Sequence, residues 1–171
     1  MINSKTKHIC ILGLMISLAF AFSYLESLIP LSVGIPGVKL GLANLVLIIT
    51  LYVLNEKDAF AISVIRILMN GLFFSGFFSM LFSLSGGILS FLAMVIAKRT
   101  NKFSPIGVSA LGGVIHNLGQ IIIAGFVMNT YRIIYYFPIL MFSGLITVII
   151  NGIIASIITN RLNKTGEIKC Q

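Results

Sequence analysis

The chain is a series of long apolar runs, each broken by a short stretch of Gly, Pro, Asn or charged residues. The runs are continuous rather than alternating, as in residues 45–51, so they predict helices and not the strands of a barrel. Six runs have lengths suited to spanning helices, and they cover residues 9–29, 38–54, 59–74, 77–97, 105–128 and 133–159. We therefore expect an all-α integral membrane protein in which residues 1–171 form a single domain of six transmembrane helices.

Composition supports this interpretation. Of the 171 residues, 58% are hydrophobic and only 9% are charged, and the mean hydropathy is +1.08. A soluble domain carries about 25% charged residues, so this chain lacks the polar surface of a water-soluble fold. At about 20 residues per span, the length leaves no room for a separate soluble domain. The first run also resembles a secretory signal, but its apolar stretch continues to residue 29, which favours a retained span.

The net charge of +8 comes from 12 Lys and Arg residues against 4 Asp and Glu residues. The basic residues flank the apolar runs, so they indicate membrane topology, and we expect no nucleic-acid partner. With the N-terminus inside, nine of the twelve fall on the cytoplasmic side: Lys5, Lys7, Lys57, Lys98, Arg99, Lys102, Arg161, Lys164 and Lys169. The positive-inside rule then predicts a multi-pass protein of the cell membrane, embedded in the lipid bilayer, with both termini cytoplasmic.

The inventory of reactive groups is small. The chain has no G-x-x-x-x-G-K-[ST] loop, so it does not carry a nucleotide-hydrolysing motor of that kind. One aspartate and three scattered glutamates cannot form the carboxylate cluster that holds magnesium in enzymes acting on prenyl diphosphates. His8 and His116 are too far apart in the sequence and in membrane depth to share a metal ion. We expect no catalytic residues, no metal site and no cofactor, and hence a protein that is not an enzyme.

Polar residues inside the spans are the main functional signal, because they are costly in a bilayer. In the fifth span, at 100° per residue, one face gathers small and polar residues: Ser109, Gly112, Gly113, His116, Asn117, Gln120 and Ala124. In the third span, Ala59, Ser63, Arg66 and Asn70 share a face in the same way. Such a face is either a seam where helices pack closely or a stripe that lines a ligand site.

Arg66 is the sharpest of these signals. It lies roughly 12 Å from the cytoplasmic end of its span, too deep to reach water easily, so it should face the bundle interior or an aqueous cavity. It is either a structural partner of Glu26 or an anchor for an anionic ligand, since a guanidinium offers a forked set of donors.

By the predicted topology, eight polar residues converge on the outer half of the bundle and describe an outward-facing pocket. Aromatic residues of the same half, Phe73, Phe74 and Tyr131, are candidates for stacking on a ligand ring, whereas Asn151 lies in the inner half and is expected to make a helix contact. Lys39 has the alternative role of an interface anchor. The eight candidate ligand-binding residues are Glu26, Lys39, Asn44, Arg66, Asn70, His116, Asn117 and Gln120.

The first span carries small residues at every fourth position, Gly13, Ser17 and Ala21. This spacing allows close helix contact, either within the bundle or with a partner protein. Glu26 is rotated by about 140° or more from these residues, so one face of the span can serve a partner while the other faces the pocket.

Four segments together resemble the Gx transporter family: IPGVKLGLAN at 35–44, RILMNG at 66–71, SLSGG at 83–87 and HNLGQ at 116–120. That family also carries the name heptaprenyl diphosphate synthase component I, and it is similar to the substrate-binding S components of energy-coupling factor (ECF) transporters. The resemblance implies a six-helix bundle that captures a small, vitamin-like or precursor molecule from the outer face. Transport would depend on a separate transmembrane coupling protein and two cytoplasmic ATPases. The family's docking motif for the coupling protein corresponds to Gly13, Ser17 and Ala21, with Gly and Ser in place of the expected alanines.

Two other functions remain open from the sequence. The first is a non-catalytic membrane scaffold associated with prenyl diphosphate or quinone synthesis, or with flavin-based extracellular electron transfer, in which the polar stripes only pack helices. The second is a proton-coupled carrier in which His116 or Glu26 titrates, although we see no inverted repeat of the kind common in such carriers.

Overall fold

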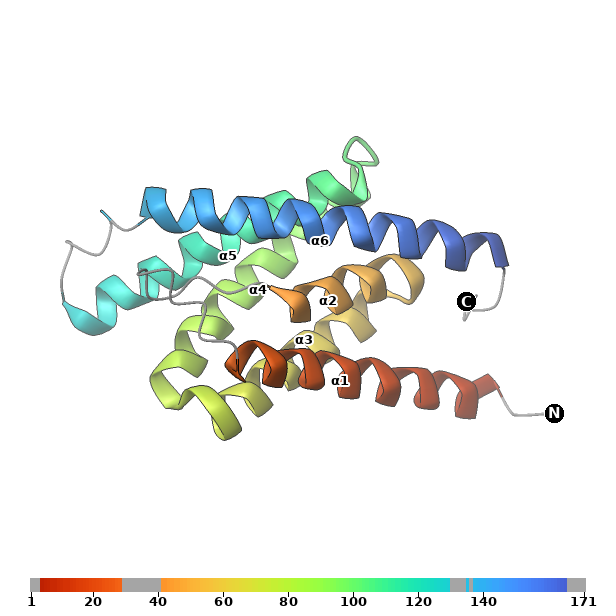
Figure 1. Ribbon diagram of the computed structural model, residues 1–171, viewed down its shortest axis with the longest axis horizontal. Coiled ribbons are helices and arrows are strands. Elements are labelled where there is room, and N and C mark those ends of the chain that lie inside the picture. The colour runs from red at the N-terminus through yellow and green to blue at the C-terminus, as the bar shows by residue number, and fades with distance from the viewer. Residues whose placement is uncertain (1–3, 29–40, 130–134, 136, 166–171) are drawn as a thin grey trace.

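The computed structural model describes residues 4–28, 41–129, 135 and 137–165, and this part of the chain is helical with no strand (Figure 1). The helices are α1 (Ser4–Leu28), α2 (Leu42–Val53), α3 (Glu56–Asn70), α4 (Phe77–Arg99), α5 (Pro105–Met128) and α6 (Phe137–Thr165), with a π-helical turn, η1 (Gly71–Ser75), after α3. Within the described residues, five segments are long and apolar enough to cross a membrane, and α2 is a shorter apolar helix. The expected all-α, multi-pass membrane protein is confirmed.

Helix boundaries follow local capping signals where the sequence supplies them. α5 has the bounds predicted from hydropathy, because Ser104 caps its first turn by accepting a hydrogen bond from the Gly107 N–H at 3.3 Å and Pro105 occupies its first position. α3 begins three residues earlier than predicted, since Asn55 accepts a hydrogen bond from the Asp58 N–H at 2.9 Å. The predicted third span continued to residue 74, but α3 gives way to the π-helical turn η1 at residue 71.

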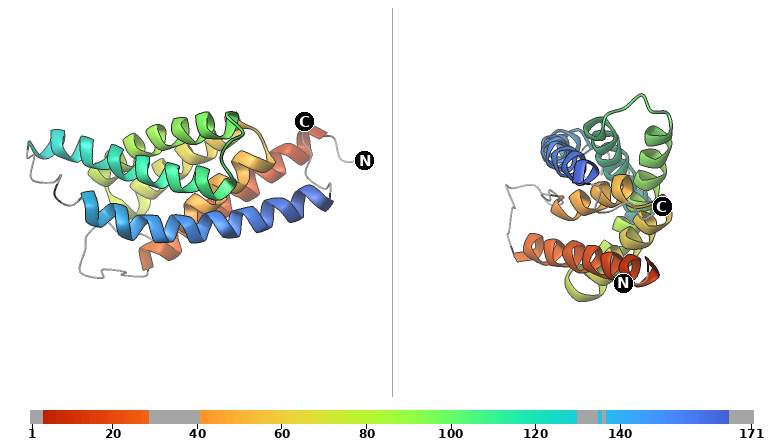
Figure 2. Two further views of the ribbon diagram at one scale, coloured as in Figure 1. Left: turned by 90° about the horizontal axis from the view of Figure 1, so that it is seen from above. Right: turned by 90° about the vertical axis from the view of Figure 1, so that its right-hand side faces the viewer.

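α2 is the central helix of the bundle. Eight of its residues are buried, Ala43 and all of 45–51, so burial extends around the whole helix rather than along one face. It contacts α1, α3 and α6, while α3, α4, α5 and α6 pack against one another in that order. Figure 2 shows α2 between α1 and α6 when the bundle is viewed along its length. The helix is thereby screened from lipid by its neighbours.

The N-terminus of α2 is held by side chains from other helices. Gly41 precedes it in the left-handed region, with φ of 67°, and offers no side-chain cap. The N–H of Leu42 instead donates to Glu26 Oε1 of α1 at 2.6 Å. Asn151 of α6 donates from Nδ2 to the Gly41 carbonyl oxygen at 3.0 Å, which confirms the helix contact expected for this buried asparagine.

The C-terminus of α2 is held from α4. Lys98 Nζ donates to the carbonyl oxygen of Leu51 at 2.5 Å and lies 5.4 Å from the ring centroid of Tyr52. A cation at the carbonyl end of a helix and a carboxylate at its amide end both complement the helix dipole. The short helix therefore has a neighbouring charge of the favourable sign at each end.

The start of α3 forms ion pairs with α1 and α4 at the same end of the bundle. Glu56 accepts hydrogen bonds from Arg99 Nε at 3.0 Å and Arg99 Nη2 at 2.5 Å, and Asp58 pairs with His8 Nε2 of α1 at 3.2 Å. α1 begins and α6 ends at this end of the bundle (Figure 1). We call it the basic end, after Lys57, Lys98 and Arg99. That the basic end faces the cytoplasm stays a prediction from the positive-inside rule.

α4 and α5 pack through a seam of small residues. Ser90 Oγ donates to the Gly112 carbonyl oxygen at 2.7 Å, and Ser85 Oγ lies 3.3 Å from the Gly119 carbonyl oxygen. A Cβ atom added at Gly86 would lie 2.5 Å from the carbonyl oxygen of His116. Only glycine permits this approach, which fixes the rotation of the polar face of α5.

Candidate functional site

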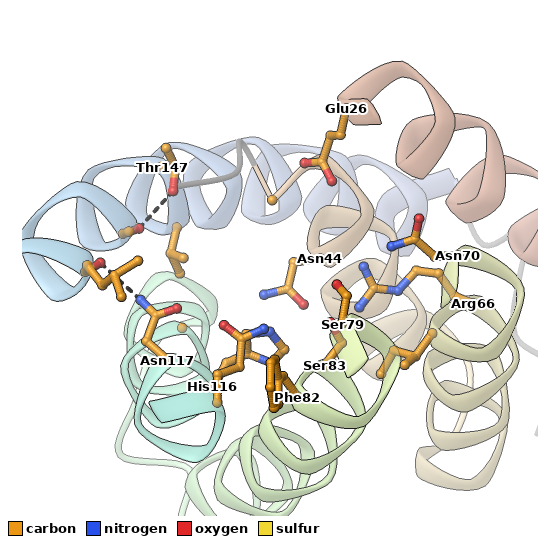
Figure 3. Close-up of a pocket in the computed structure, with 17 residues that line it drawn as sticks. Glu26, Asn44, Arg66, Asn70, Ser79, Phe82, Ser83, His116, Asn117 and Thr147 are labelled. Atoms are coloured by element: carbon orange, nitrogen blue, oxygen red, sulfur yellow. Dashed lines mark hydrogen bonds between the residues drawn. The ribbon is translucent and has the colours of Figure 1, made fainter. Parts of the chain in front are cut away.

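A polar cavity of about 270 Å³ lies inside the bundle, at the end opposite the basic end (Figure 3). The ends of α1 and α3 and the starts of α2, α4 and α6 converge there, beside the middle of α5. The lining combines hydrogen-bonding side chains with a few apolar ones: Glu26, Gly41, Asn44, Arg66, Ile67, Asn70, Ser79, Phe82, Ser83, Gly113, His116, Asn117, Gln120, Leu140, Gly144, Thr147 and Val148.

The cavity brings together the candidate residues that the structure describes. Seven of the eight line it: Glu26, Asn44, Arg66, Asn70, His116, Asn117 and Gln120. The eighth, Lys39, lies outside the described residues. They come from the end of α1, the start of α2, the end of α3 and the middle of α5. Successive helices run in opposite directions, so the end of one helix and the start of the next lie at the same membrane depth. A ligand-binding role for this set stays a prediction.

Arg66 supplies a permanent positive charge to the lining. It stands on α3 one turn before Asn70, and its guanidinium points toward the centre of the cavity, beside Ser79 (Figure 3). Its Nε atom is buried and makes no hydrogen bond within the described part of the chain. A buried guanidinium donor without an acceptor is costly, so this atom marks a position where an acceptor is favoured.

Glu26 supplies the opposite charge. Its carboxylate lines the cavity from α1, accepts the Leu42 N–H and attracts Arg66 electrostatically. The structural interpretation of Arg66 as a partner of Glu26 is therefore partly correct. The Glu26 carboxylate is not dedicated to Arg66, however, because it also caps the start of α2.

The polar face of α5 serves both packing and lining. Ser109 Oγ donates to the Val148 carbonyl oxygen at 2.9 Å, and Asn117 Nδ2 donates to the Leu140 carbonyl oxygen at 3.1 Å, so both residues join α5 to α6. His116, Asn117 and Gln120 also line the cavity. The face thus contributes to helix packing and to the cavity lining, with Asn117 in both roles. That the stripe binds a ligand stays a prediction.

Besides the aliphatic residues of the lining, sequence reasoning missed three hydroxyl side chains and one aromatic one: Ser79, Phe82 and Ser83 on α4, and Thr147 on α6. Ser79 and Ser83 are four residues apart, a spacing that would have placed both on one helical face. Serine and threonine are common in membrane helices, so their presence alone did not indicate a position in the cavity lining.

The aromatic prediction was wrong for two residues. Phe73 and Phe74 belong to η1 and pack against Phe20 of α1, with ring centroids 5.9 Å and 5.4 Å away, and neither lines the cavity. Phe82 is the aromatic side chain in the lining, while Tyr131 lies outside the described residues. The π-helical turn rotates the two phenylalanines away from the face that carries Arg66 and Asn70.

The small residues of α1 lie on the outside of the bundle. Gly13, Ser17 and Ala21 are all exposed, and a Cβ added at Gly13 would meet nothing within 4 Å. Ser17 Oγ donates to the Gly13 carbonyl oxygen at 2.8 Å, which satisfies the hydroxyl within the helix. This face of α1 is turned away from the cavity that Glu26 lines.

The lining has the chemistry of a binding site. It offers a cation, a carboxylate, an imidazole, amides and hydroxyls around one aromatic ring. Among the residues that the structure describes, no three His, Cys, Asp or Glu side chains come together as metal ligands. Such a lining can hold and orient a small polar molecule that carries charge.

Comparison with known proteins places the chain in a family. A family model described as heptaprenyl diphosphate synthase component I matches residues 15–158. No curated protein and no solved structure gives a significant match. The matched residues run from within α1 to within α6 and include the entire cavity lining. The chain therefore belongs to the heptaprenyl diphosphate synthase component I family, as its four sequence motifs predicted.

Proposed function

We propose that this protein is the substrate-binding S component of an ECF-type importer, and that it captures a small, anionic, vitamin-like or precursor molecule. The observation that carries the proposal is the polar cavity, inside which Arg66 Nε is buried and has no hydrogen-bond partner among the residues that the structure describes. Intramembrane charges face cavities or pathways for polar solutes, since lipid cannot solvate them. In a bundle stabilised only by helix packing, a buried guanidinium donor without an acceptor would lower the stability and add nothing to it.

The position of the cavity supports capture from outside the cell. It lies at the end opposite Lys57, Lys98 and Arg99, and the positive-inside rule assigns that basic end to the cytoplasm. An anionic solute on the outer side would then meet Arg66 without crossing the full bilayer.

Transport would be driven by other chains. The sequence has no G-x-x-x-x-G-K-[ST] loop, so ATP hydrolysis is assigned to two cytoplasmic ATPases acting through a transmembrane coupling protein. The exposed residues Gly13, Ser17 and Ala21 form the face of α1 proposed to contact that coupling protein, because small residues allow helices to approach closely. In this role the protein is not an enzyme and needs neither a metal nor a cofactor.

The test is gentle purification of the tagged protein from its native membrane, followed by mass spectrometry of bound proteins and released small molecules. We expect a membrane coupling protein, ATPases and a stoichiometric anionic small molecule. Arg66→Gln should release the small molecule and still recover the partner proteins, whereas the control Lys57→Gln at the basic end should retain both. Retention of the small molecule by folded Arg66→Gln protein would remove Arg66 from the site.

A second candidate is a non-catalytic scaffold for an enzyme of prenyl diphosphate or quinone synthesis, or for flavin-based extracellular electron transfer. The observation that favours it is the description of the family as a synthase component. Recovery of a prenyl-lipid enzyme or flavoprotein, without ATPases and without a bound small molecule, would support this candidate over the importer.

A further inference from the structure

The start of α2 opens onto the cavity. Gly41 and Asn44 both line it, and Gly41 provides no side chain to cap the helix. The first N–H groups of a helix are unpaired within the helix and carry partial positive charge, so they attract anions. In this structure the Leu42 N–H donates to the carboxylate of Glu26 at 2.6 Å.

A second positive group faces the same space. Arg66 lines the cavity, and its Nε is buried without a hydrogen-bond partner in the described residues. Figure 3 shows Glu26 at the top of the cavity, with Asn44 and the Arg66 guanidinium side by side below it. The helix start and the guanidinium together favour an anion, and among the described lining residues Glu26 supplies the carboxylate.

We infer that Glu26 is a resident carboxylate that holds the anion position of the cavity until a ligand carboxylate displaces it from the Leu42 N–H and pairs with Arg66. The inference rests on the proposed function and specifies its ligand as a small carboxylic acid. A carboxylate is favoured over other anions because the displaced group is itself a carboxylate, and a planar guanidinium binds carboxylates in forked geometry. Asn44 and Asn70 are placed to contact the same head group, and Phe82 to contact an apolar body.

Displacement also explains how an empty site remains stable. Without a ligand, Glu26 stabilises both the amide end of α2 and the Arg66 cation. With a ligand bound, a second carboxylate takes over these contacts while Glu26 remains nearby as a like charge. Glu26 therefore weakens ligand binding, and its removal should strengthen it, which is unusual for a residue that lines a binding site.

The test uses three ring compounds that differ only in their head group: benzoate, benzamide and benzylamine. Binding to the purified full-length protein in nanodiscs is measured by calorimetry for wild type, Glu26→Gln and the control Glu56→Gln. Glutamine keeps the acceptor for Leu42 but removes the charge, and Glu56 is a carboxylate at the basic end that pairs with Arg99. We expect wild type to prefer benzoate, Glu26→Gln to bind benzoate about tenfold more tightly, and Glu56→Gln to match wild type.

A measurement on the unmutated protein guards against a folding defect in the variant. The chain has three glutamates, Glu26, Glu56 and Glu167, so carboxyl-labelled glutamate gives three carbon NMR signals. Benzoate should shift one of them, and comparison with Glu56→Gln and Glu167→Gln, each of which lacks one signal, identifies the third as Glu26. A shift of the Glu26 signal supports displacement.

Three results would overturn the inference. Benzylamine preferred by wild type and lost in Glu26→Gln would make Glu26 a direct partner of a cationic ligand. Equal benzoate affinity in wild type and Glu26→Gln, with an unmoved Glu26 signal, would exclude displacement. No benzoate binding at any concentration would exclude the anion position. Each result leaves the importer proposal to be decided separately by the proteins and small molecules that copurify.

Discussion

Replacing Gly86 by alanine should separate α4 from α5 and disturb the cavity between them. The new methyl group would lie 2.5 Å from the carbonyl oxygen of His116, 2.9 Å from Gln120 Cγ and 3.2 Å from His116 Nδ1. The carbonyl oxygen belongs to the helix backbone and cannot rotate away. Non-bonded heavy atoms prefer separations of about 3.5–4.0 Å, so the two helix backbones must move apart by roughly 1 Å at this point.

The energetic cost follows from two opposing effects. Forcing an extra methyl group into a packed seam costs about 1–3 kcal/mol. Alanine in place of glycine within a helix raises the stability of the helix by about 0.5–1 kcal/mol. We therefore expect Gly86→Ala to lower the free energy of unfolding by up to about 2.5 kcal/mol, and to weaken ligand binding because His116 and Gln120 both line the cavity.

The matched control is Gly13→Ala. Gly13 is also inside a helix, but an added Cβ meets nothing within 4 Å, so alanine there should be neutral or stabilising. Unfolding in mixed micelles can be followed by helical circular dichroism, since the chain has no tryptophan to report by fluorescence. If Gly86→Ala proved as stable as Gly13→Ala, the close contact between α4 and α5 described above would be wrong.

Two further substitutions test the supports of α2. Lys98→Met keeps the aliphatic stem but removes the hydrogen bond to the Leu51 carbonyl oxygen. It should lower the free energy of unfolding by about 1–3 kcal/mol. An unchanged unfolding midpoint would mean that water or lipid head groups replace this donor. Asn151→Leu removes the bond to Gly41 and should cost about 0.6–1.7 kcal/mol, as expected for hydrogen bonds between membrane helices. The exposed Asn160→Leu on the same helix should cost nothing measurable in the same assay, and equal losses for the two variants would contradict the assignment.

The features that could be predicted from the sequence are those with local causes. α5 was bounded correctly by hydropathy, because the apolar run begins where Ser104 and Pro105 start the helix locally. The convergence of Arg66 and His116 in one cavity followed from helical periodicity and from the alternation of helix direction. Neither inference needed a side-chain contact between distant segments.

The features that escaped prediction have causes far away in the sequence. The cap of α2 at Leu42 comes from Glu26, and no pattern around Leu42 indicates it. Phe82 enters the cavity because the rotation of α4 is fixed by the contact of Gly86 with α5, which hydropathy cannot express. Phe73 was misplaced because the sequence gives no warning of a π-helical turn.

The dependence of α2 on other helices has a consequence for biogenesis. With twelve residues, α2 is about 18 Å long, well short of a bilayer core of about 30 Å, so it cannot complete a crossing as an independent unit. The carboxylate that caps its first turn is synthesised before it, but Lys98 is synthesised 47 residues after the Leu51 carbonyl that it binds. The order in which the helices leave the ribosome therefore differs from the order in which they become stable. The innermost helix of the bundle is among the first to be made, and it acquires its last support only when α6, which carries Asn151, has been made.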